Sequence, residues 1–168
     1  MKNKICNIQQ ALTHQLKEMY DGEKKIQKNL AFCTQQVVSP MLKQEMIRYI
    51  GNTSDQITKL ERIFNYLMDE PYGSVNDVMF ELITHTQNVL RCTGQEPIRD
   101  VLLITSVQTI CQYKISGYTA ALALALELDL EKPAELLQEI ITWEREATNI
   151  LAELARLELH PGMVVPAE

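Results

Sequence analysis

The chain has 168 residues, of which 46% are hydrophobic and 23% are charged, and its formal net charge at pH 7 is −6. This length and composition are typical of one globular domain, so residues 1–168 are interpreted as a single domain with a core over about 5–159 and a tail at 160–168. The acidic balance and the lack of a basic stripe exclude a general nucleic-acid-binding role. No apolar run approaches ~20 residues, which excludes a membrane span.

The amino terminus and the cysteines indicate a cytoplasmic protein. The first six residues lack the apolar core of a signal peptide. Cys6, Cys33, Cys92 and Cys111 are far apart, with no Cys-x-x-Cys pair among them. We therefore expect reduced thiols that are mostly buried.

Apolar residues at helical spacing, divided by proline, glycine and serine, predict helices along the whole chain. A long helix is expected over 5–38, and Ser39-Pro40, an N-cap followed by proline, opens a second over 40–68. Residues 70–74 form a loop, and a shorter helix follows over 76–91. Two more long helices are expected over 97–128 and from Pro133 to 159, the last of them ended by His160-Pro161-Gly162.

Alternating leucines from Leu122 to Leu130 have the period of a strand. The residues between them include alanines and a glutamate, which favour a helix, so this segment is expected to be helical and buried on more than one side.

The connection between the second and third long helices predicts the topology. A helix of about 28 residues is ~42 Å long, and residues 70–97 are enough to cross a bundle of that length. The second and third long helices would then be parallel. The predicted fold class is all-α: a four-helix up-down-down-up bundle with a short extra crossover helix, which is the ferritin-like topology.

Two glutamates lie where leucine is expected on a buried helix face. Glu23 continues the apolar stripe Leu12, Leu16, Met19, Ile26, Leu30, and Glu144 continues the stripe Leu137, Ile140, Ala147, Leu151. A carboxylate that faces a bundle core is costly unless it is paired, protonated or bound to a metal. The centre of the molecule is therefore either a metal site or the remains of one.

Several short motifs follow one another along the chain: Leu16-x-x-x-Tyr20-Asp-Gly-Glu23-Lys24, Thr53-x-x-Gln56-Ile57, Arg99-Asp100, Gln108, Tyr113-x-Ile115-x-x-Tyr118, Ala134-x-Leu136-Leu137, and Glu144 with Leu151 and Ala155. By these the chain resembles the ferritin-like YciE/YciF family of bacterial proteins over about residues 10–157. The resemblance implies a four-helix bundle that pairs into homodimers, and an association with stress conditions.

The resemblance also implies where metal ligands would lie. Ferritin-like di-iron sites use one Glu from each of two helices and a Glu-x-x-His pair from each of the other two. The family's first-helix glutamate is retained as Glu23. In the second helix the acids and histidine are replaced within Gly51-Asn52-Thr53-Ser54-Asp55, and in the third the pattern becomes Cys111-Gln112-Tyr113-Lys114. The last helix keeps Glu144, with Thr148 in place of an aspartate.

Two core carboxylates thus remain where a di-iron centre needs at least four. The vestigial site positions are Glu23, Ser54, Cys111, Lys114 and Glu144. No metal, cofactor or catalytic residue is expected. Lys114 shares a face with Val107, Cys111 and Tyr118, and its ammonium could supply the positive charge that a metal supplies elsewhere. A small shift in helix register would instead place Lys114 on the surface as a solvated charge.

Three functions stay open. The first is a structural or interaction protein without metal and without enzymatic activity. The second is an iron-handling protein or di-iron-type oxidase with a reduced site on Glu23 and Glu144, which would need Asn52, Asp55 or Cys111 as further ligands; Cys111 with the two glutamates could also hold zinc. The third is a stress sensor that uses the thiol of Cys111 or Cys33, which requires an exposed thiol of low pKa.

The remaining polar and small residues have simpler expected roles. The histidines are expected at the surface or at a helix cap (His14, His85, His160), and three tyrosines in the core with hydrogen-bonded hydroxyls (Tyr20, Tyr113, Tyr118). Gly22 and Gly51 are expected to allow close contact between helices.

Overall fold

The computed structural model describes residues 4–94 and 97–160, and within these ranges the chain contains helices and no strand. Four long helices form a bundle: α1 (Ile8–Asn29), α3 (Pro40–Leu67), α5 (Pro97–Glu127) and α6 (Glu131–Leu159). Two shorter helices are α2 (Ala31–Thr34) and α4 (Asp77–Cys92). Most of the predicted tail, residues 161–168, lies outside the described ranges.

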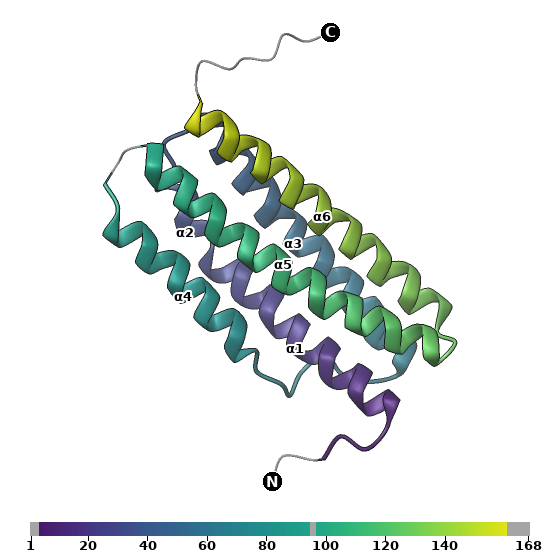
Figure 1. Cartoon of the computed structure of the whole chain (residues 1–168). Coiled ribbons are helices and arrows are strands. Elements are labelled where there is room, and N and C mark those ends of the chain that lie inside the picture. The colour runs from purple at the N-terminus through teal and green to yellow at the C-terminus, as the bar shows by residue number, and fades with distance from the viewer. Residues whose placement is uncertain (1–3, 95–96, 161–168) are drawn as a thin grey trace, which may run out of the picture.

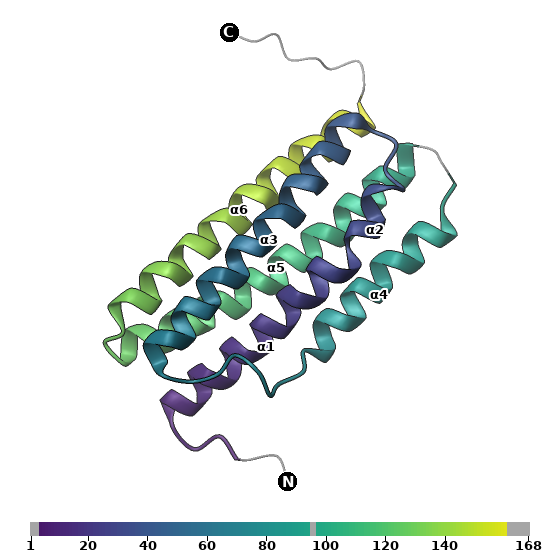
Figure 2. The same cartoon turned by 180° about the vertical axis from the view of Figure 1, so that it is seen from behind.

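The four long helices have the predicted up-down-down-up order. In Figures 1 and 2, α1 and α6 run in one direction, whereas α3 and α5 run in the other. α4 leads back along the outside of the bundle from the end of α3 to the start of α5. α1 and α6 each pack against both α3 and α5, and α4 packs against α5 and α1. The all-α bundle with a crossover helix is therefore confirmed.

Side chains that precede the helices fix where three of them begin. The side chain of Asn7 accepts a hydrogen bond from the backbone N–H of Gln10, that of Ser39 from Leu42, and that of Asn76 from Met79. Each of these bonds satisfies a backbone donor that has no partner within its own helix. Short polar residues therefore set the first turn of α1, α3 and α4.

The first predicted helix, 5–38, is interrupted in the structure. α1 ends at Asn29, and α2 is a separate turn of helix. The chain at Val38 and Ser39 is held by Asp100, whose carboxylate accepts hydrogen bonds from the two backbone N–H groups at 2.6–3.2 Å. Arg99 donates to the side chain of Gln36 at 2.6 Å and to a carbonyl at the end of α4. The contacts with Val38, Ser39 and Gln36 come from residues about sixty positions away, so helical periodicity alone could not predict that the helical segment stops before residue 38.

The leucine-rich segment is helical, as predicted, as far as Glu127. A tight turn follows, in which Asp129 has φ 55° and the N–H of Leu130 bonds to the carbonyl of Ala125. α6 begins at Glu131, two positions before Pro133. Leu126 is 60% exposed, so this segment has one open side.

The hydrophobic core is divided into two halves along the bundle. One half contains Ile26, Leu42, Met46, Leu103, Val107 and Leu151. The other contains Leu12, Leu16, Leu60, Tyr118 and Leu137. Buried polar side chains from all four long helices include Glu23 from α1, Gln56 from α3, Lys114 from α5 and Glu144 from α6.

Of the two glycines expected at helix contacts, Gly22 has that role and Gly51 does not. A Cβ atom at Gly22 would lie 3.0 Å from Nδ2 of Asn76, at the start of α4. A Cβ atom at Gly51 would meet nothing within 4 Å, because this residue is exposed. The prediction for Gly51 was therefore wrong.

Candidate functional site

Lys114 lies at the centre of the bundle and is fully buried. Its Nζ atom is 2.9 Å from Oε1 of Glu23, 2.6 Å from Oε1 of Glu144 and 2.7 Å from Oε1 of Gln56. An ammonium group has three N–H donors and no acceptor, so these three oxygens match its hydrogen-bonding capacity. Of the two alternatives left open for Lys114, the structure shows the inward one, in which the ammonium pairs with both glutamates.

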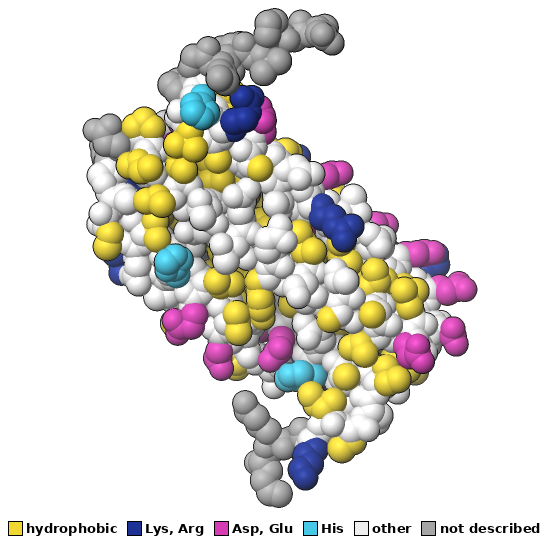
Figure 3. Space-filling model, viewed as in Figure 1, with side chains coloured by type: hydrophobic (Ala, Val, Ile, Leu, Met, Phe, Trp, Pro, Cys, Tyr) yellow, Lys and Arg dark blue, Asp and Glu magenta, His cyan; other side chains and the backbone are white. Residues whose placement is uncertain are grey.

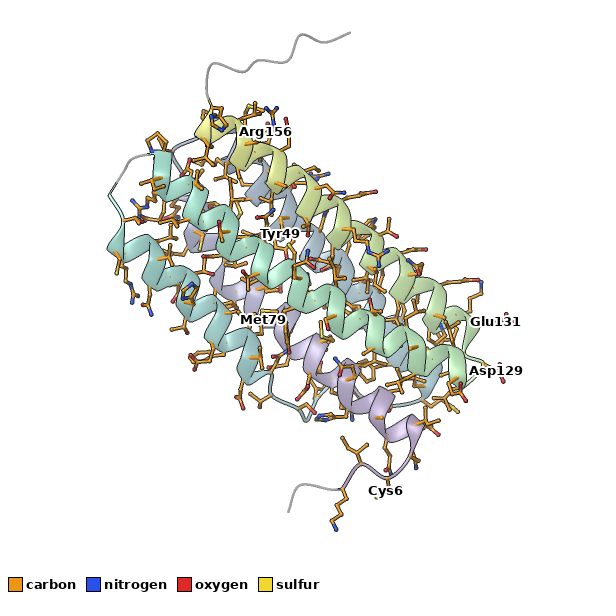
Figure 4. All side chains as sticks on the ribbon, viewed as in Figure 1. Cys6, Tyr49, Met79, Asp129, Glu131 and Arg156 are labelled. Atoms are coloured by element: carbon orange, nitrogen blue, oxygen red, sulfur yellow. The ribbon has the colours of Figure 1, made fainter. Side chains whose placement is uncertain are left out.

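Other polar side chains complete the arrangement. Nε2 of Gln56 donates to Glu144 Oε1 at 2.7 Å. The hydroxyl of Tyr49 donates to Glu144 Oε2 at 3.2 Å, and the hydroxyl of Tyr118 donates to Glu23 Oε1 at 2.6 Å. We call Glu23, Tyr49, Gln56, Lys114, Tyr118 and Glu144 the central cluster. Tyr49, labelled in Figure 4, marks its place midway along the bundle.

The charges in the central cluster do not balance if every group is in its usual form. Two carboxylates face one ammonium, and Oε2 of Glu23 is buried without a hydrogen-bond partner. Burial raises the pKa of Glu23; the charge of Lys114 opposes this effect and the charge of Glu144 adds to it, so the pKa lies above its ordinary value. Burial alone would lower the pKa of Lys114, but Glu144 and Glu23 outweigh it and raise the pKa. Lys114 is therefore charged, and the raised pKa of Glu23 favours its protonated form.

The residues of the central cluster do not fit a di-iron centre. The position between the carboxylates is held by an ammonium, which can donate hydrogen bonds but cannot coordinate a cation. Apart from the two tyrosines, the central cluster offers two carboxylates and a glutamine as possible ligands, whereas a di-iron centre uses four carboxylates and two histidines. Within residues 4–94 and 97–160, no three His, Cys, Asp or Glu side chains come together in a way that could hold a metal ion.

Ser54, expected among the site positions, lies outside the central cluster. Its side chain is exposed and accepts a hydrogen bond from Gln27 at 2.8 Å. Asn52 is half-buried, and Asp55 is exposed to solvent. None of the three has a hydrogen bond to the central cluster, so the structure gives no support for Asn52 or Asp55 as additional ligands.

Cys111 is buried beside the central cluster but is not poised for reaction. Burial, with a further contribution from the charge of Glu144, raises the pKa of its thiol to about 12. Burial also raises the pKa of Cys33 to about 11. A thiol of this kind is protonated at neutral pH and reacts slowly. The thiol sensor therefore lacks the thiolate that it requires at Cys111 and Cys33. The zinc site lacks the ligand geometry, since no three possible ligands come together among the described residues.

Sequence reasoning missed two members of the central cluster, Gln56 and Tyr49. Tyr49, Thr53, Gln56 and Leu60 are spaced by four, three and four residues, so they share one face of α3. The same signal that singled out Glu23, a polar residue on a buried stripe, was present at Gln56. Because the exposed polar residues Ser54 and Asp55 come directly before Gln56, the sequence did not single out Gln56 as a polar residue on a buried stripe.

The histidines lie at the surface, as expected, and two of the three tyrosines expected in the core are buried. The three histidines are exposed, and His160 is the C-cap residue of α6. Tyr20 and Tyr118 are buried and Tyr113 is half-buried. Their hydroxyls donate to Glu61, Glu23 and Asn76 respectively at 2.6–3.0 Å.

This fold and its interior can be compared with known proteins. Residues 7–160 match the family model described as DUF892, a domain of unknown function. The chain belongs to this family. It is 28% identical over 150 residues to Protein YciF of Escherichia coli strain K12, an alignment that covers 88% of this chain and 90% of the relative. The resemblance to the YciE/YciF family is thus confirmed.

Two solved structures show the same fold. The E. coli stress protein YciF superposes with a TM-score of 0.89 at 24% identity, covering 92% of this chain and 98% of the other. YcfI from Rhodopseudomonas palustris, provisionally described as a structural protein, superposes with a TM-score of 0.85 at 23% identity, covering 90% and 97%. Among the described residues, none of the helices combines the length and the hydropathy needed to cross a bilayer.

Proposed function

We propose that this protein is a metal-free member of the ferritin-like bundles, and that it acts as a structural or interaction protein rather than as an enzyme. One observation supports the proposal: Nζ of Lys114 lies within 2.6–2.9 Å of three oxygens from the other three long helices. The ammonium supplies the positive charge that a metal would otherwise bring to these carboxylates. A buried ion pair that is well hydrogen-bonded can hold helices in register, and this is the role assigned to the central cluster.

The descriptions of the two relatives agree with a role of this kind. The E. coli relative is described as a stress protein, and the R. palustris protein is provisionally described as structural. We extend a stress-associated structural role to this chain. A cytoplasmic location is part of the proposal, because its four cysteines are all free thiols, as is usual in a reducing compartment.

The test is the metal content of untagged protein purified without chelators. We expect less than about 0.1 iron, manganese or zinc ion per chain by elemental analysis, because a lysine that fills the position between the carboxylates repels a cation. The matched control is Glu144→Gln, prepared from the same host and the same medium. Near-stoichiometric metal in the wild-type protein that is lost in the control would refute the proposal. A rate of ferrous oxidation above that of buffer, also lost in Glu144→Gln, would refute it independently.

A further inference from the structure

The connection between α3 and α4 exposes a line of apolar side chains. Met68, Tyr72, Val75 and Val78 follow one another at intervals of three or four residues, from the C-cap of α3 to the first turn of α4. Each of these side chains is more than half exposed. We call the four the crossover strip. Apolar side chains that gather at the surface with polar residues around them are typical of interaction sites.

Neither packing nor the backbone explains the methionine of the crossover strip. Met68 is 93% exposed, so it contributes little to the core. Its backbone is left-handed, with φ 52° and ψ 42°. Glycine or asparagine is usual at such a C-cap position, because most other side chains are disfavoured there. An apolar side chain that is kept in this conformation and surrounded by solvent indicates a role in binding.

The charges around the crossover strip are mainly negative. From residue 63 to residue 90 the sequence contains no Lys or Arg. The exposed acidic residues of this span are Asp69, Glu70, Asp77 and Glu81. Lys17 of α1 pairs with the first of them at 3.2 Å, whereas the other three carboxylates have no ion pair among the described residues. Figure 3 shows the start of α4, where acidic and hydrophobic side chains lie next to one another.

The middle of the crossover strip is fixed on α1. The ring of Tyr72 meets that of Tyr20 edge-on, with the ring centroids 5.7 Å apart. The backbone N–H of Asn76 donates to the carboxylate of Asp21 at 2.7 Å, and the side chain of Asn76 donates to the carbonyl of Glu18 at 3.0 Å. A partner would therefore not have to order this segment, which lowers the entropic cost of binding.

We propose that the crossover strip binds a basic amphipathic helix of another protein. Such a helix carries its apolar side chains on one stripe and Lys or Arg beside the stripe. The stripe would cover the four apolar side chains, while the cations meet Glu70, Asp77 and Glu81. Removal of apolar groups from water supplies affinity, and the opposite charges supply orientation and faster association.

The charges favour this partner over other occupants of an apolar surface. A nucleic acid or an anionic lipid surface would be repelled by the carboxylates. A second copy that apposed its own crossover strip would bring like charges together. The inference rests on the interaction role proposed above and names the partner of that role, but it does not depend on the metal content of the central cluster. Peptide binding and elemental analysis can therefore fail separately.

The test uses the full-length chain and a fluorescein-labelled peptide of about four helical turns, made of Leu and Lys with the leucines on one stripe. Two peptides are its controls: one with Glu in place of every Lys, and one of the same composition in an order that has no stripe. Fluorescence anisotropy measures each dissociation constant. We expect both controls to bind the wild-type protein at least ~10-fold more weakly than the striped Leu/Lys peptide, because each lacks one of the two recognised features.

Paired substitutions locate the site. Met68→Gly with Val78→Thr removes apolar groups, and glycine suits the left-handed backbone at position 68. Asp77→Asn with Glu81→Gln removes negative charges. Each pair should raise the dissociation constant of the striped Leu/Lys peptide at least ~5-fold.

Matched pairs lie at exposed positions outside the crossover strip. They are Met41→Ser with Ile47→Thr on α3, and Glu135→Gln with Glu146→Gln on α6. These pairs should change the same dissociation constant less than ~2-fold. Circular dichroism verifies that every variant is folded.

Four results would overturn the proposal. The first is equal binding of the striped peptide and either control peptide. The second is unchanged affinity in the folded strip variants. The third is co-sedimentation of the wild-type protein with phosphatidylcholine vesicles that Met68→Gly with Val78→Thr abolishes, because the occupant would then be lipid. The fourth is self-association of the wild-type protein that the same pair abolishes, because the occupant would then be a second chain.

Discussion

At the scale of single residues, Lys114 determines the state of the interior. Its ammonium pairs with both Glu23 and Glu144, and each of these three side chains is at most 1% exposed. Neither carboxylate has another Lys, Arg or His within 4.0 Å among the described residues. Lys114 is therefore the one cationic partner of both carboxylates among the described residues.

Lys114→Met should lower the free energy of unfolding by about 3–5 kcal/mol, because it leaves two buried carboxylates without a counter-charge. Urea denaturation measures the change. The matched control is Lys132→Met: Lys132 also pairs with a glutamate, Glu135, but both side chains are about 60% exposed, so its effect should be much smaller. Adding Glu23→Gln and Glu144→Gln to Lys114→Met should restore much of the loss. Equal effects of the two lysine substitutions would contradict the interpretation that Lys114 supplies a counter-charge on which the folded state depends.

Glu23 should make stability depend on pH. Because burial raises the pKa of Glu23 in the folded state, the folded protein binds a proton that the unfolded protein releases above about 4.3, the ordinary pKa of Glu. The unfolded state then holds fewer protons, so stability falls as pH rises through the folded-state pKa. The contribution is fully present below about pH 4.3.

Glu23→Gln should abolish this pH dependence, since the amide keeps the acceptor for Tyr118 and Lys114 but cannot ionise. Urea denaturation from pH 5 to 8 should show the wild type losing stability relative to Glu23→Gln as pH rises. The control is Glu153→Gln at an exposed carboxylate whose pKa is lowered by Arg156. That control should run parallel to the wild type over this range. Parallel curves for Glu23→Gln would show that Glu23 is ionised throughout.

Periodicity predicted the inward direction of Glu23 and Glu144, because each lies on a stripe of apolar residues, but it left Lys114 open between the core and the surface. It could not predict which atoms meet. The pairing of Gln56 with both Lys114 and Glu144 depends on the relative height of α3, α5 and α6, which is set by packing in both halves of the core. Ser54 was misplaced for a related reason: one residue of register on a helix turns a side chain by 100°.

At the scale of helices, close approach depends on small residues at particular positions. A Cβ atom at Gly117 of α5 would lie 2.5 Å from Sδ of Met19 on α1 and 3.1 Å from the side chain of Gln15. Met19 is 1% exposed and has little room to move. The absence of a side chain at Gly117 is therefore what allows α1 and α5 to pack at this distance.

Gly117→Ala and Gly51→Ala should change stability in opposite directions. Alanine favours a helix by up to ~1 kcal/mol over glycine, and at Gly51 of α3, where nothing lies within 4 Å of the new atom, this gain should appear in full. At Gly117 the overlap with Met19 should outweigh it and cost ~1–3 kcal/mol. Thermal unfolding of the two variants and the wild type measures both changes in stability. Stabilisation by both would mean that Met19 shifts freely.

The end of a helix could be predicted where a local contact sets it, and could not where residues far along the chain set it. α3 begins at the predicted Ser39-Pro40 because its N-cap bond is local. The end of α2 at Thr34 was not predictable, because Gln36, Val38 and Ser39, which follow it, are held by Arg99 and Asp100 at the start of α5. The Arg99-Asp100 pair that the sequence singled out thus has a structural role.

At the scale of the whole molecule, the up-down-down-up order requires α4 to be attached to the outside of the bundle. Asn76, which is 2% exposed, makes this attachment. Its Nδ2 donates to the carbonyl of Glu18 on α1 at 3.0 Å, and its Oδ1 accepts from the hydroxyl of Tyr113 on α5 at 3.0 Å and from the N–H of Met79 at 2.8 Å. One side chain thus joins three helices.

Asn76→Asp should weaken the attachment while it keeps the N-cap of α4. A carboxylate still accepts from Met79 and Tyr113, but it cannot donate to Glu18, and it brings a buried charge close to Asp21, whose carboxylate accepts from the N–H of residue 76 at 2.7 Å. The expected cost is ~1–3 kcal/mol. Asn7→Asp is the matched control, because Asn7 is an exposed N-cap that accepts one backbone N–H; it should change stability by less than ~0.5 kcal/mol.

Hydrogen exchange locates the effect of Asn76→Asp within the molecule. Protection should fall first in α4, because its contacts with α1 and α5 are the ones that the substitution weakens. α5 and α6 pack against each other along the bundle and should keep their protection. Uniform loss of protection in all helices would instead mean that α4 unfolds only with the rest of the molecule, and that the crossover is an integral part of one cooperative unit.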